Sequence, residues 1–280
     1  MKNKKTRYMT ILTAAIALSL TSCVKDELFN TPHPDQGAVI VTTDWSAKSA
    51  EAEIPQNYTL RMETEEQAVS GIINTFKTLL PQGSYELTAF NTPEHIGISG
   101  NTATVAESEP GYMEPMPGYL FSAHQTIDVM ADDTLKVTVP VKQLVRLLNV
   151  ELTVTEGDYN RVQSATATLD GVASRIDIVT GERSTAAKSL NTLVQNGNKF
   201  TTSFRLLGII PSASQKLTVS ILFTNGDTQQ IESDDILTDF NDRTEAKTLT
   251  GNLLLPIEAG VTGATITDWK ETDGGDVDAN

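Results

Sequence analysis

From residue 38 onward the chain alternates apolar and polar residues in short runs, which glycine, proline, asparagine and aspartate separate. Apolar residues occupy every second position from Leu148 to Val154 and again from Leu217 to Phe223, mostly with threonine, serine, glutamate or asparagine between them. Such alternation gives a strand one buried and one solvated face. The pattern predicts an all-β protein whose strands pack as two-sheet sandwiches.

The expected strands form two series, with helix as the minor element. They cover residues 38–43, 58–62, 84–91, 103–105, 125–129 and 134–140 in the first half, and residues 147–155, 164–169, 175–179, 199–207, 215–223 and 247–257 in the second. Between the first strands, apolar residues such as Val69, Ile72 and Phe76 recur at steps of three and four. This spacing predicts a short amphipathic helix over residues 64–80, although Gly71 within it weakens helical propensity.

The strand pattern breaks near residue 145, which leaves six or seven strands on each side. One hydrophobic core rarely serves more than about 250 residues. We therefore expect an N-terminal β-sandwich over residues 38–145 and a C-terminal β-sandwich over residues 146–270. Residues 23–37 are typical of an extended linker, and residues 271–280 of an acidic tail.

The N-terminus has the three parts of a signal peptide. A basic start that ends at Arg7 precedes a mostly apolar run from Tyr8, and the small residues Thr21 and Ser22 lead to Cys23. Leu20-Thr21-Ser22-Cys23 resembles the lipobox of bacterial lipoproteins, which implies cleavage after residue 22 and a lipid on Cys23. The alternatives are an ordinary secretory signal and an uncleaved membrane helix, but the apolar run is shorter than the roughly 20 residues that a spanning helix needs.

Lys25, Asp26 and Glu27 follow the cysteine directly. A lysine followed by acidic residues resembles the signal that exports Bacteroidetes lipoproteins to the outer face of the outer membrane. A solvated linker would have the same composition. We expect an outer-membrane protein that is held by its lipid and faces the exterior.

The charge of the chain excludes one class of partner. The formal net charge is −15, and residues 1–22 contain four basic and no acidic residues, so their removal leaves 17 basic and 36 acidic side chains and a charge of −19. Nucleic-acid binding depends on lysine and arginine that displace counterions, and here the long-range field is repulsive. Cys23 is the single cysteine, so no intramolecular disulfide forms.

Residues for catalysis or metal binding do not occur at useful spacings. His33, His95 and His124 lie far apart, and the sequence has no G-x-S-x-G, H-E-x-x-H or P-loop pattern. Acidic pairs such as Asp132-Asp133 sit in polar, turn-like sequence. We expect neither an enzyme nor a bound cofactor or metal.

One modification site is suggested by Asp133-Thr134-Leu135. This tripeptide resembles the Asp-Thr-aliphatic acceptor of O-glycosylation in Bacteroidetes. Thr134 is therefore a candidate for glycosylation.

Two sets of segments carry a wider family resemblance. Residues 80–91 (LPQGSYELTAFN), Pro93-Glu94 and residues 117–121 (PGYLF) resemble the first domain of FimB-type fimbrillin anchor and accessory proteins of Bacteroidetes. Residues 139–149, 167–173 and 177–181 resemble the second domain, and the closing residues 266–269 also fit. The order and spacing of these segments agree over nearly all of the chain after the signal peptide.

The resemblance implies two tandem transthyretin-like β-sandwiches and a role in surface fimbriae that assemble by strand exchange between fimbrillin-type structural or accessory subunits. Polymerising fimbrillins lose an N-terminal strand to a protease that cuts after arginine. Here no arginine lies between Cys23 and Arg61. This departure favours a terminal anchor or an uncleaved accessory unit over a stalk subunit.

The C-terminal segment offers a candidate donor strand. Leu253, Leu255, Ile257 and Val261 alternate, and the apolar pair Ile266 and Trp269 follows them. Inserted into a neighbour's sandwich, such a strand gains main-chain hydrogen bonds while its alternate side chains fill the core. The alternative is an ordinary last strand of the protein's own second domain.

A second functional class remains open, namely a surface lipoprotein that binds glycans. Sugars usually stack on exposed aromatic side chains, and the chain has only two tryptophans, Trp45 and Trp269, both in or beside strand-like sequence. A ligand on a host or bacterial surface is compatible with either function.

Overall fold

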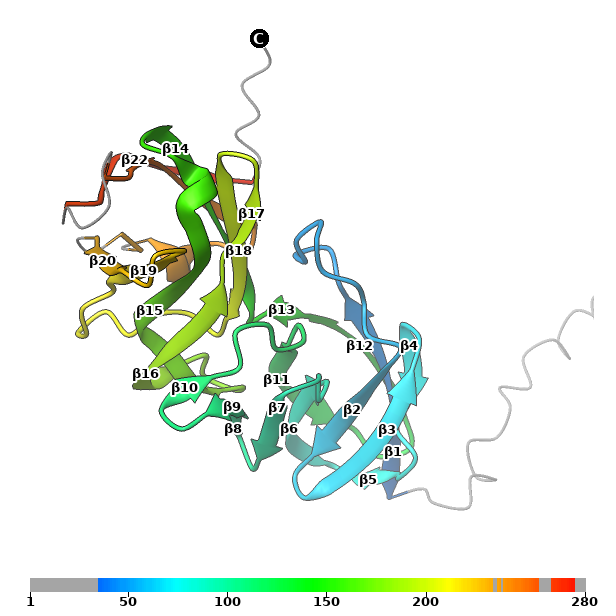
Figure 1. Ribbon diagram of the computed structural model, residues 1–280. Coiled ribbons are helices and arrows are strands. Elements are labelled where there is room, and N and C mark those ends of the chain that lie inside the picture. The colour runs from blue at the N-terminus through cyan, green and yellow to red at the C-terminus, as the bar shows by residue number, and fades with distance from the viewer. Residues whose placement is uncertain (1–34, 234–235, 238, 257–262, 275–280) are drawn as a thin grey trace, which may run out of the picture.

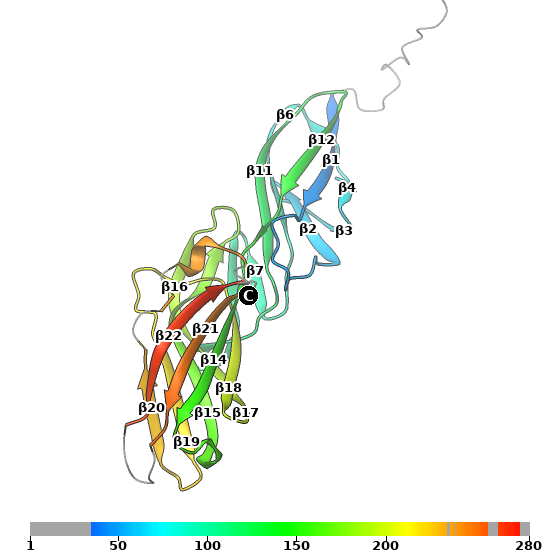
Figure 2. The same ribbon diagram turned by 90° about the horizontal axis from the view of Figure 1, so that it is seen from above.

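A computed structural model gives the structure of the chain and describes residues 35–233, 236–237, 239–256 and 263–274. The protein is all-β, as the alternation predicted, and its strands form two hydrophobic cores, one in each half of an elongated molecule (Figures 1 and 2). The regular helical elements in the described chain are two short 3-10 turns, η2 (Tyr159–Arg161) and η3 (Phe240–Asp242). No described helix is long and apolar enough to cross a membrane.

The N-terminal half has two sheets around its core. One has the order β13 (Lys142–Gln143), β11 (Phe121–Val129), β6 (Gly83–Phe90), β2 (Asn57–Met62) and β3 (Glu65–Ser70). The other has the order β12 (Thr134–Pro140), β1 (Gln36–Asp44) and β4 (Ile73–Thr75), and β5 (Leu80–Pro81) pairs with the start of β1. β1 and β12 run parallel.

The C-terminal half also has two sheets. One has the order β20 (Thr228–Glu232), β19 (Leu217–Phe223), β15 (Val162–Asp177), β16 (Arg183–Thr192), β10 (Tyr112–Met113) and β9 (Glu107–Glu109). Two more strands extend this sheet: β8 (Thr102–Val105) pairs with the end of β15, and β7 (Ile96–Ser99) pairs with β8. The other has the order β17 (Val194–Asn196), β18 (Lys199–Leu206), β14 (Arg146–Glu156), β21 (Lys247–Leu254) and β22 (Thr265–Asp273).

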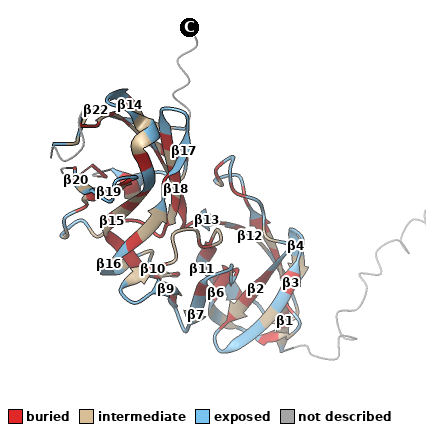
Figure 3. Cartoon of the chain, in the orientation of Figure 1, coloured by how far each residue is buried: buried red, intermediate tan, exposed pale blue. Residues whose placement is uncertain are grey.

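The alternation that predicted the strands also determines their inner faces. Leu148, Val150 and Leu152 of β14 are fully buried, while residues between them are half-buried or exposed. Figure 3 shows buried positions recurring along the strands of both halves. Burying one such side chain contributes about 1.5–3 kcal/mol, so burial of these faces is a main favourable contribution to folding.

The predicted helix over residues 64–80 is wrong. The segment contains β3 and β4, and Glu63 (φ 53°) and Gly71 (φ 75°) turn the chain before and after β3. Only part of the apolar set points inward: Val69 is buried, but Ile72 and Ile73 are 52% and 67% exposed. β3 pairs with β2, and β4 pairs with β1. These pairings outweighed the helical spacing of the apolar residues, which the tertiary packing does not use as one face.

The second half differs from the prediction at β15. The expected strands 164–169 and 175–179 belong to one strand that is interrupted by a bulge, since its register with β16 shifts between Leu169 and Val172. Gly171 has φ 70° there, and a Cβ atom on it would meet the carbonyl oxygen of Ser214 at 2.4 Å. A glycine in this bulge lets the strand bend without leaving the sheet.

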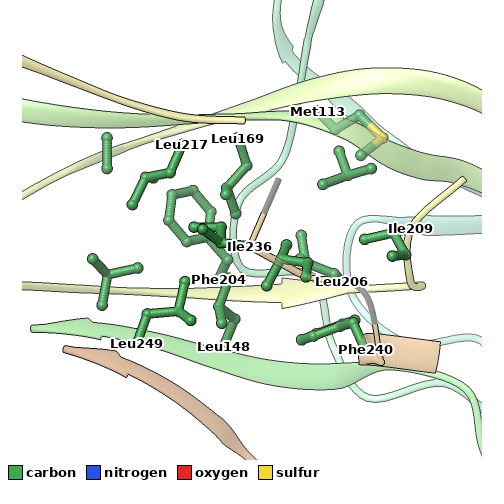
Figure 4. Packing of buried hydrophobic residues seen from close by; sticks show 14 of the residues in the cluster. Met113, Leu148, Leu169, Phe204, Leu206, Ile209, Leu217, Ile236, Phe240 and Leu249 are labelled. Carbon is green, nitrogen blue, oxygen red and sulfur yellow. The ribbon is translucent and has the colours of Figure 1, made fainter. Parts of the chain in front are cut away.

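The two halves interlock. Strands β7 to β10, over residues 96–113, lie within the range expected for the first sandwich, but they join the sheet of β15 and β16. Met113 from this segment belongs to the second core, together with Leu206 and Ile209 (Figure 4). β1 also begins at Gln36, inside the expected linker, and β22 includes Glu271 to Asp273 of the expected acidic tail.

Candidate assembly edge and junction hollow

The described chain begins at the free tip of the N-terminal half. Gln36 pairs with Pro81, and its carbonyl oxygen accepts a hydrogen bond from the N–H of Asp132 at 3.0 Å. The tip lies at one end of the long axis, and β19 and β20 lie at the other (Figure 2). Cys23, the lipobox Leu20 to Ser22 and the expected export signal Lys25 to Glu27 lie outside the described residues.

Thr134 lies at the same tip. It is exposed at the start of β12, opposite Ala38 of β1. Its N–H donates to the side chain of Asp133 at 2.7 Å, while the N–H of Ala38 donates to the carbonyl of Asp133 at 2.9 Å. The side chain of Thr134 is therefore accessible for modification, and hydrogen bonds fix the backbone around Asp133 next to it.

The first part of the candidate donor strand lies inside the protein's own sheet. β21 runs parallel to β14 on one side and antiparallel to β22 on the other. Leu253 and Leu255 are buried in the second core. In this structure both residues therefore belong to the protein's own second domain, at the end of an ordinary strand. This was the alternative to a donor strand. Ile257 and Val261 lie outside the described residues.

β22 is the edge strand of its sheet, and a bulge decides how it packs. Ile266 and Trp269 are three residues apart, so a regular strand would point them to opposite faces. Instead Asp268 adopts φ 53° and the register with β21 shifts beside Gly251. Both side chains consequently lie against Gly251, whose missing Cβ atom would meet them at 2.8 and 3.2 Å, and both cover the open edge of the second core.

Charged side chains hold the other end of β22. The guanidinium of buried Arg146, on β14, donates to the carbonyls of Glu245 and Phe240 at 2.5 and 2.8 Å and to the carboxylate of Asp273 at 2.7 Å. Arg243 also contacts that carboxylate, at 3.1 Å. Next to them, buried Lys247 pairs with Glu271. β22 is thus fixed by ion pairs at its end and by two apolar side chains near its start.

The tryptophans do not form a stacking surface. Trp45 is 7% exposed, packs edge-on against Tyr58 and Phe121, and donates its indole N–H to Thr43 at 2.8 Å. Trp269 is half-buried on Gly251. The aromatic side chains that sequence reasoning considered for glycans are therefore used in packing.

A hollow of about 730 Å³, here called the junction hollow, opens where the two halves meet. Side chains of the neighbouring strands β2, β6 and β11 line what is here called its floor, and the β7–β8 turn lines its side. Figure 1 shows where these elements lie. It is lined by Arg61, Glu63, Thr64, Glu66, Glu86, Thr88, Gly100, Asn101, His124, Thr126 and Val179. Sequence reasoning missed this group, because its members come from separate strands and no local pattern connects them.

Hydrogen bonds fix the floor of the junction hollow. His124 Nε2 lies 2.9 Å from the carboxylate of Glu86, which also accepts a hydrogen bond from the hydroxyl of Thr126 at 3.0 Å. The other ring nitrogen, Nδ1, lies 3.1 Å from the hydroxyl of Thr88. A neutral imidazole with its proton on Nε2 satisfies both contacts.

Arg61 connects the floor to the side wall. Its guanidinium donates to the carbonyl of Gly100 at 2.8 Å and to the side chain of Asn101 at 2.5 Å, and it lies 5.1 Å from the ring centroid of Phe90. A second arginine, Arg205, lies over Tyr119 elsewhere along the junction. Burial raises the pKa of the Tyr119 phenol, and the charge of Arg205 opposes that shift.

The described chain contains no group of three or more histidine, cysteine, aspartate or glutamate residues that could hold a metal ion. His95 and His124 each lie beside one glutamate, Glu94 at 3.5 Å and Glu86 at 2.9 Å, in separate places.

Comparison with known proteins identifies the family. No curated protein matches the chain. Among solved structures, the fimbrial anchor protein Mfa2 from Porphyromonas gingivalis has a TM-score of 0.60 and 11% identity, over 85% of this chain and 98% of that one. Two candidate adhesins from Bacteroides ovatus have TM-scores of 0.61 and 0.57, with 8% and 15% identity, over 86% and 79% of this chain and 96% and 89% of theirs.

At these identities the similar structures establish a shared fold. The family comparison supports more than the fold, because the model of the fimbrillin-A associated anchor proteins Mfa1 and Mfa2 matches residues 47–274 of this chain. That range runs from β2 to β22, the edge strand, and so covers both halves except β1. The chain belongs to the family of fimbrillin-A associated anchor proteins.

Proposed function

We propose that the protein is a lipid-anchored fimbrial anchor or accessory subunit, which joins fimbrillin subunits at the outer surface of the outer membrane by β-strand exchange and so supports adhesion. Membership in the anchor family, over residues 47–274, is the observation that carries this proposal. Its role is structural and not enzymatic, and its domains are transthyretin-like sandwiches. The lipid sits on Cys23.

The polarity of the molecule supports an anchoring role. β1 starts at the tip of the N-terminal half, whereas β21 ends and β22 begins toward the opposite end of the long axis (Figure 2). A lipid joined through the chain that precedes β1 would hold the first tip near the membrane. The C-terminal half would then project outward, toward incoming subunits.

The packing of the last two strands supports β22, in preference to β21, as the strand that would exchange. Donation of β21 would remove Leu253 and Leu255 from the protein's own core, where each contributes about 1.5–3 kcal/mol. β22 buries less, since only Ile266 and Trp269 pack on the core and both are half-buried. We therefore propose β22 as the exchanging strand. Its transfer would break the ion pairs of Arg146 with Asp273 and of Lys247 with Glu271, but it would keep β21 in the core and expose an edge for a strand of another subunit.

The test is recovery of fimbrial subunits with the tagged full-length protein from native cells, compared with a variant that lacks residues 265–280. We expect the deletion to remove the partner subunits while the protein stays in the membrane fraction. Because the deletion also removes the partners of Arg146 and Lys247, a double substitution Ile266→Ser and Trp269→Ser, which keeps those ion pairs, serves as the second variant. Undiminished recovery with both variants would overturn the assignment of β22.

Two modifications are tested separately. Cys23→Ala should move the protein out of the membrane fraction, and retention there would contradict lipid anchoring. Mass spectrometry of the native protein should find a glycan on the peptide that contains Thr134, and Thr134→Val should abolish that mass. An unmodified peptide would rule the glycan out.

A further inference from the structure

The junction hollow offers both hydrogen-bond donors and acceptors. Its acceptors are the carboxylates of Glu63, Glu66 and Glu86. Donors are the remaining N–H groups of Arg61 and the side-chain amide of Asn101, since their bonds to each other and to Gly100 use only part of their capacity. The hydroxyls of Thr64, Thr88 and Thr126 can donate or accept, and Val179 is the single aliphatic side chain in the lining.

This lining selects the chemistry of a ligand. An apolar ligand would leave the polar groups unpaired, which is costly. An anion would face three carboxylates in a chain of net charge −15. A cation would meet the guanidinium of Arg61 within the same space. A neutral ligand with adjacent hydroxyls, each both donor and acceptor, can pair with the carboxylates, the amide and the arginine together.

We infer that the junction hollow is a binding site for a neutral saccharide. Its volume of about 730 Å³ lies within the range of about 300–1,000 Å³ that is typical of small-molecule sites. The inference goes beyond anchoring, because it gives the protein a ligand of its own at a site whose lining contains no residue of β22.

Glu86 is the central residue of this site. Its carboxylate is held at 2.9 Å by His124 and at 3.0 Å by Thr126, both on the neighbouring strand β11. A carboxylate oriented in this way retains lone pairs for two neighbouring hydroxyls of a sugar. Because the protein fixes it before the ligand arrives, binding costs little side-chain entropy.

Both halves of the molecule complete the site. Glu86, Thr88, His124 and Thr126 belong to the N-terminal sheet, whereas Gly100 and Asn101 come from the β7–β8 turn, which pairs with β15 of the second half. No phenylalanine, tyrosine or tryptophan lines the junction hollow, so recognition depends on hydrogen bonds more than on stacking. A single site of this kind is weak, but many copies on one cell surface would bind a dense glycan by avidity.

The experiment uses the full-length protein in detergent on an array of neutral, sialylated and sulfated oligosaccharides, followed by solution titration with the best neutral glycan. Glu86→Gln keeps the size of the side chain and removes one strong acceptor. Glu107→Gln is the matched control, because Glu107 is exposed on β9 and lies outside the lining. An oligolysine peptide is titrated in parallel.

We expect binding to neutral glycans, at least a tenfold weaker affinity with Glu86→Gln, and unchanged affinity with Glu107→Gln. Both variants should keep the thermal midpoint of the parent, which separates lost binding from lost folding. Asn101→Asp provides a second check, since it replaces an amide donor with a carboxylate and should also weaken binding. Preference for acidic glycans, binding of oligolysine in place of sugar, no bound glycan, or equal affinity in both glutamate variants would each overturn the inference. Capture of fimbrial subunits through β22 is independent of all these outcomes.

Discussion

Replacement of Arg146 by methionine should destabilise the C-terminal half and loosen β22. The side chain of Arg146 is 5% exposed and donates to three acceptors, of which Asp273 lies on β22. Its guanidinium also lies 4.9 Å from the ring centroid of Phe240. Methionine fills much of the volume but supplies no donor.

The magnitude follows from the groups that lose a partner. Breaking a buried ion pair by removing one side costs about 3–5 kcal/mol. Two carbonyls, of Phe240 and Glu245, lose a donor and add to the cost, whereas Arg243 still contacts Asp273 and reduces it. We therefore expect the free energy of unfolding of this half to fall by about 3–5 kcal/mol.

The two tryptophans allow the halves to be measured separately, because Trp45 lies in the first core and Trp269 lies on β22. In a Trp45→Phe background, urea unfolding followed by fluorescence reports Trp269 alone. With an m-value of about 2 kcal/mol/M, the loss corresponds to a midpoint lower by about 1.5–2.5 M. Lys270→Met, at an exposed position of the same strand, is the matched control and should shift the midpoint little.

A midpoint that moves by less than about 0.5 M in Arg146→Met would refute the reasoning. That result would mean that the ion pair is no more favourable than an apolar side chain of similar size. A double-mutant cycle with Asp273→Asn distinguishes the contribution of the pair from that of the two carbonyls, since only the pair should produce a coupling energy.

Three further predictions concern the edge and the junction. Gly251→Ala should cost about 1–3 kcal/mol in urea unfolding and expose Trp269 to solvent, seen as a red shift of its fluorescence; an unshifted spectrum would contradict the close packing. Asp268→Val should cost about 1–2 kcal/mol, because a β-branched residue resists φ 53°, and a neutral result would argue against the bulge. The raised pKa of Tyr119 means that the unfolded chain loses the phenolic proton first, so stability should fall as the pH rises above about 10 and through the folded pKa; Tyr119→Phe should reduce that loss, and an unchanged slope would contradict it.

Local sequence predicted strands well where one face is buried and the other is solvated, because such strands alternate apolar and polar residues. The alternation from Leu148 to Val154 predicted β14, and the structure confirms a strand there with a buried inner face. Turn residues bounded most of the other strands in the same way. The family resemblance was likewise readable from sequence, because it depends on the order of short segments, and the family model confirms it over residues 47–274. The signal peptide and the export signal stay predictions, since they lie outside the described residues.

Sequence by itself thus determined the all-β class, the positions of most strands and the family resemblance. Only the tertiary structure decided that residues 64–80 form strands, that residues 96–113 join the second half, and that a bulge at Asp268 turns Ile266 and Trp269 to one face. The junction hollow belongs to the same group, since its residues lie on different strands. The physical reason is that pairing partners, register and contacts between sheets join residues distant in sequence, and their free energies outweigh the weak local preferences that a pattern records.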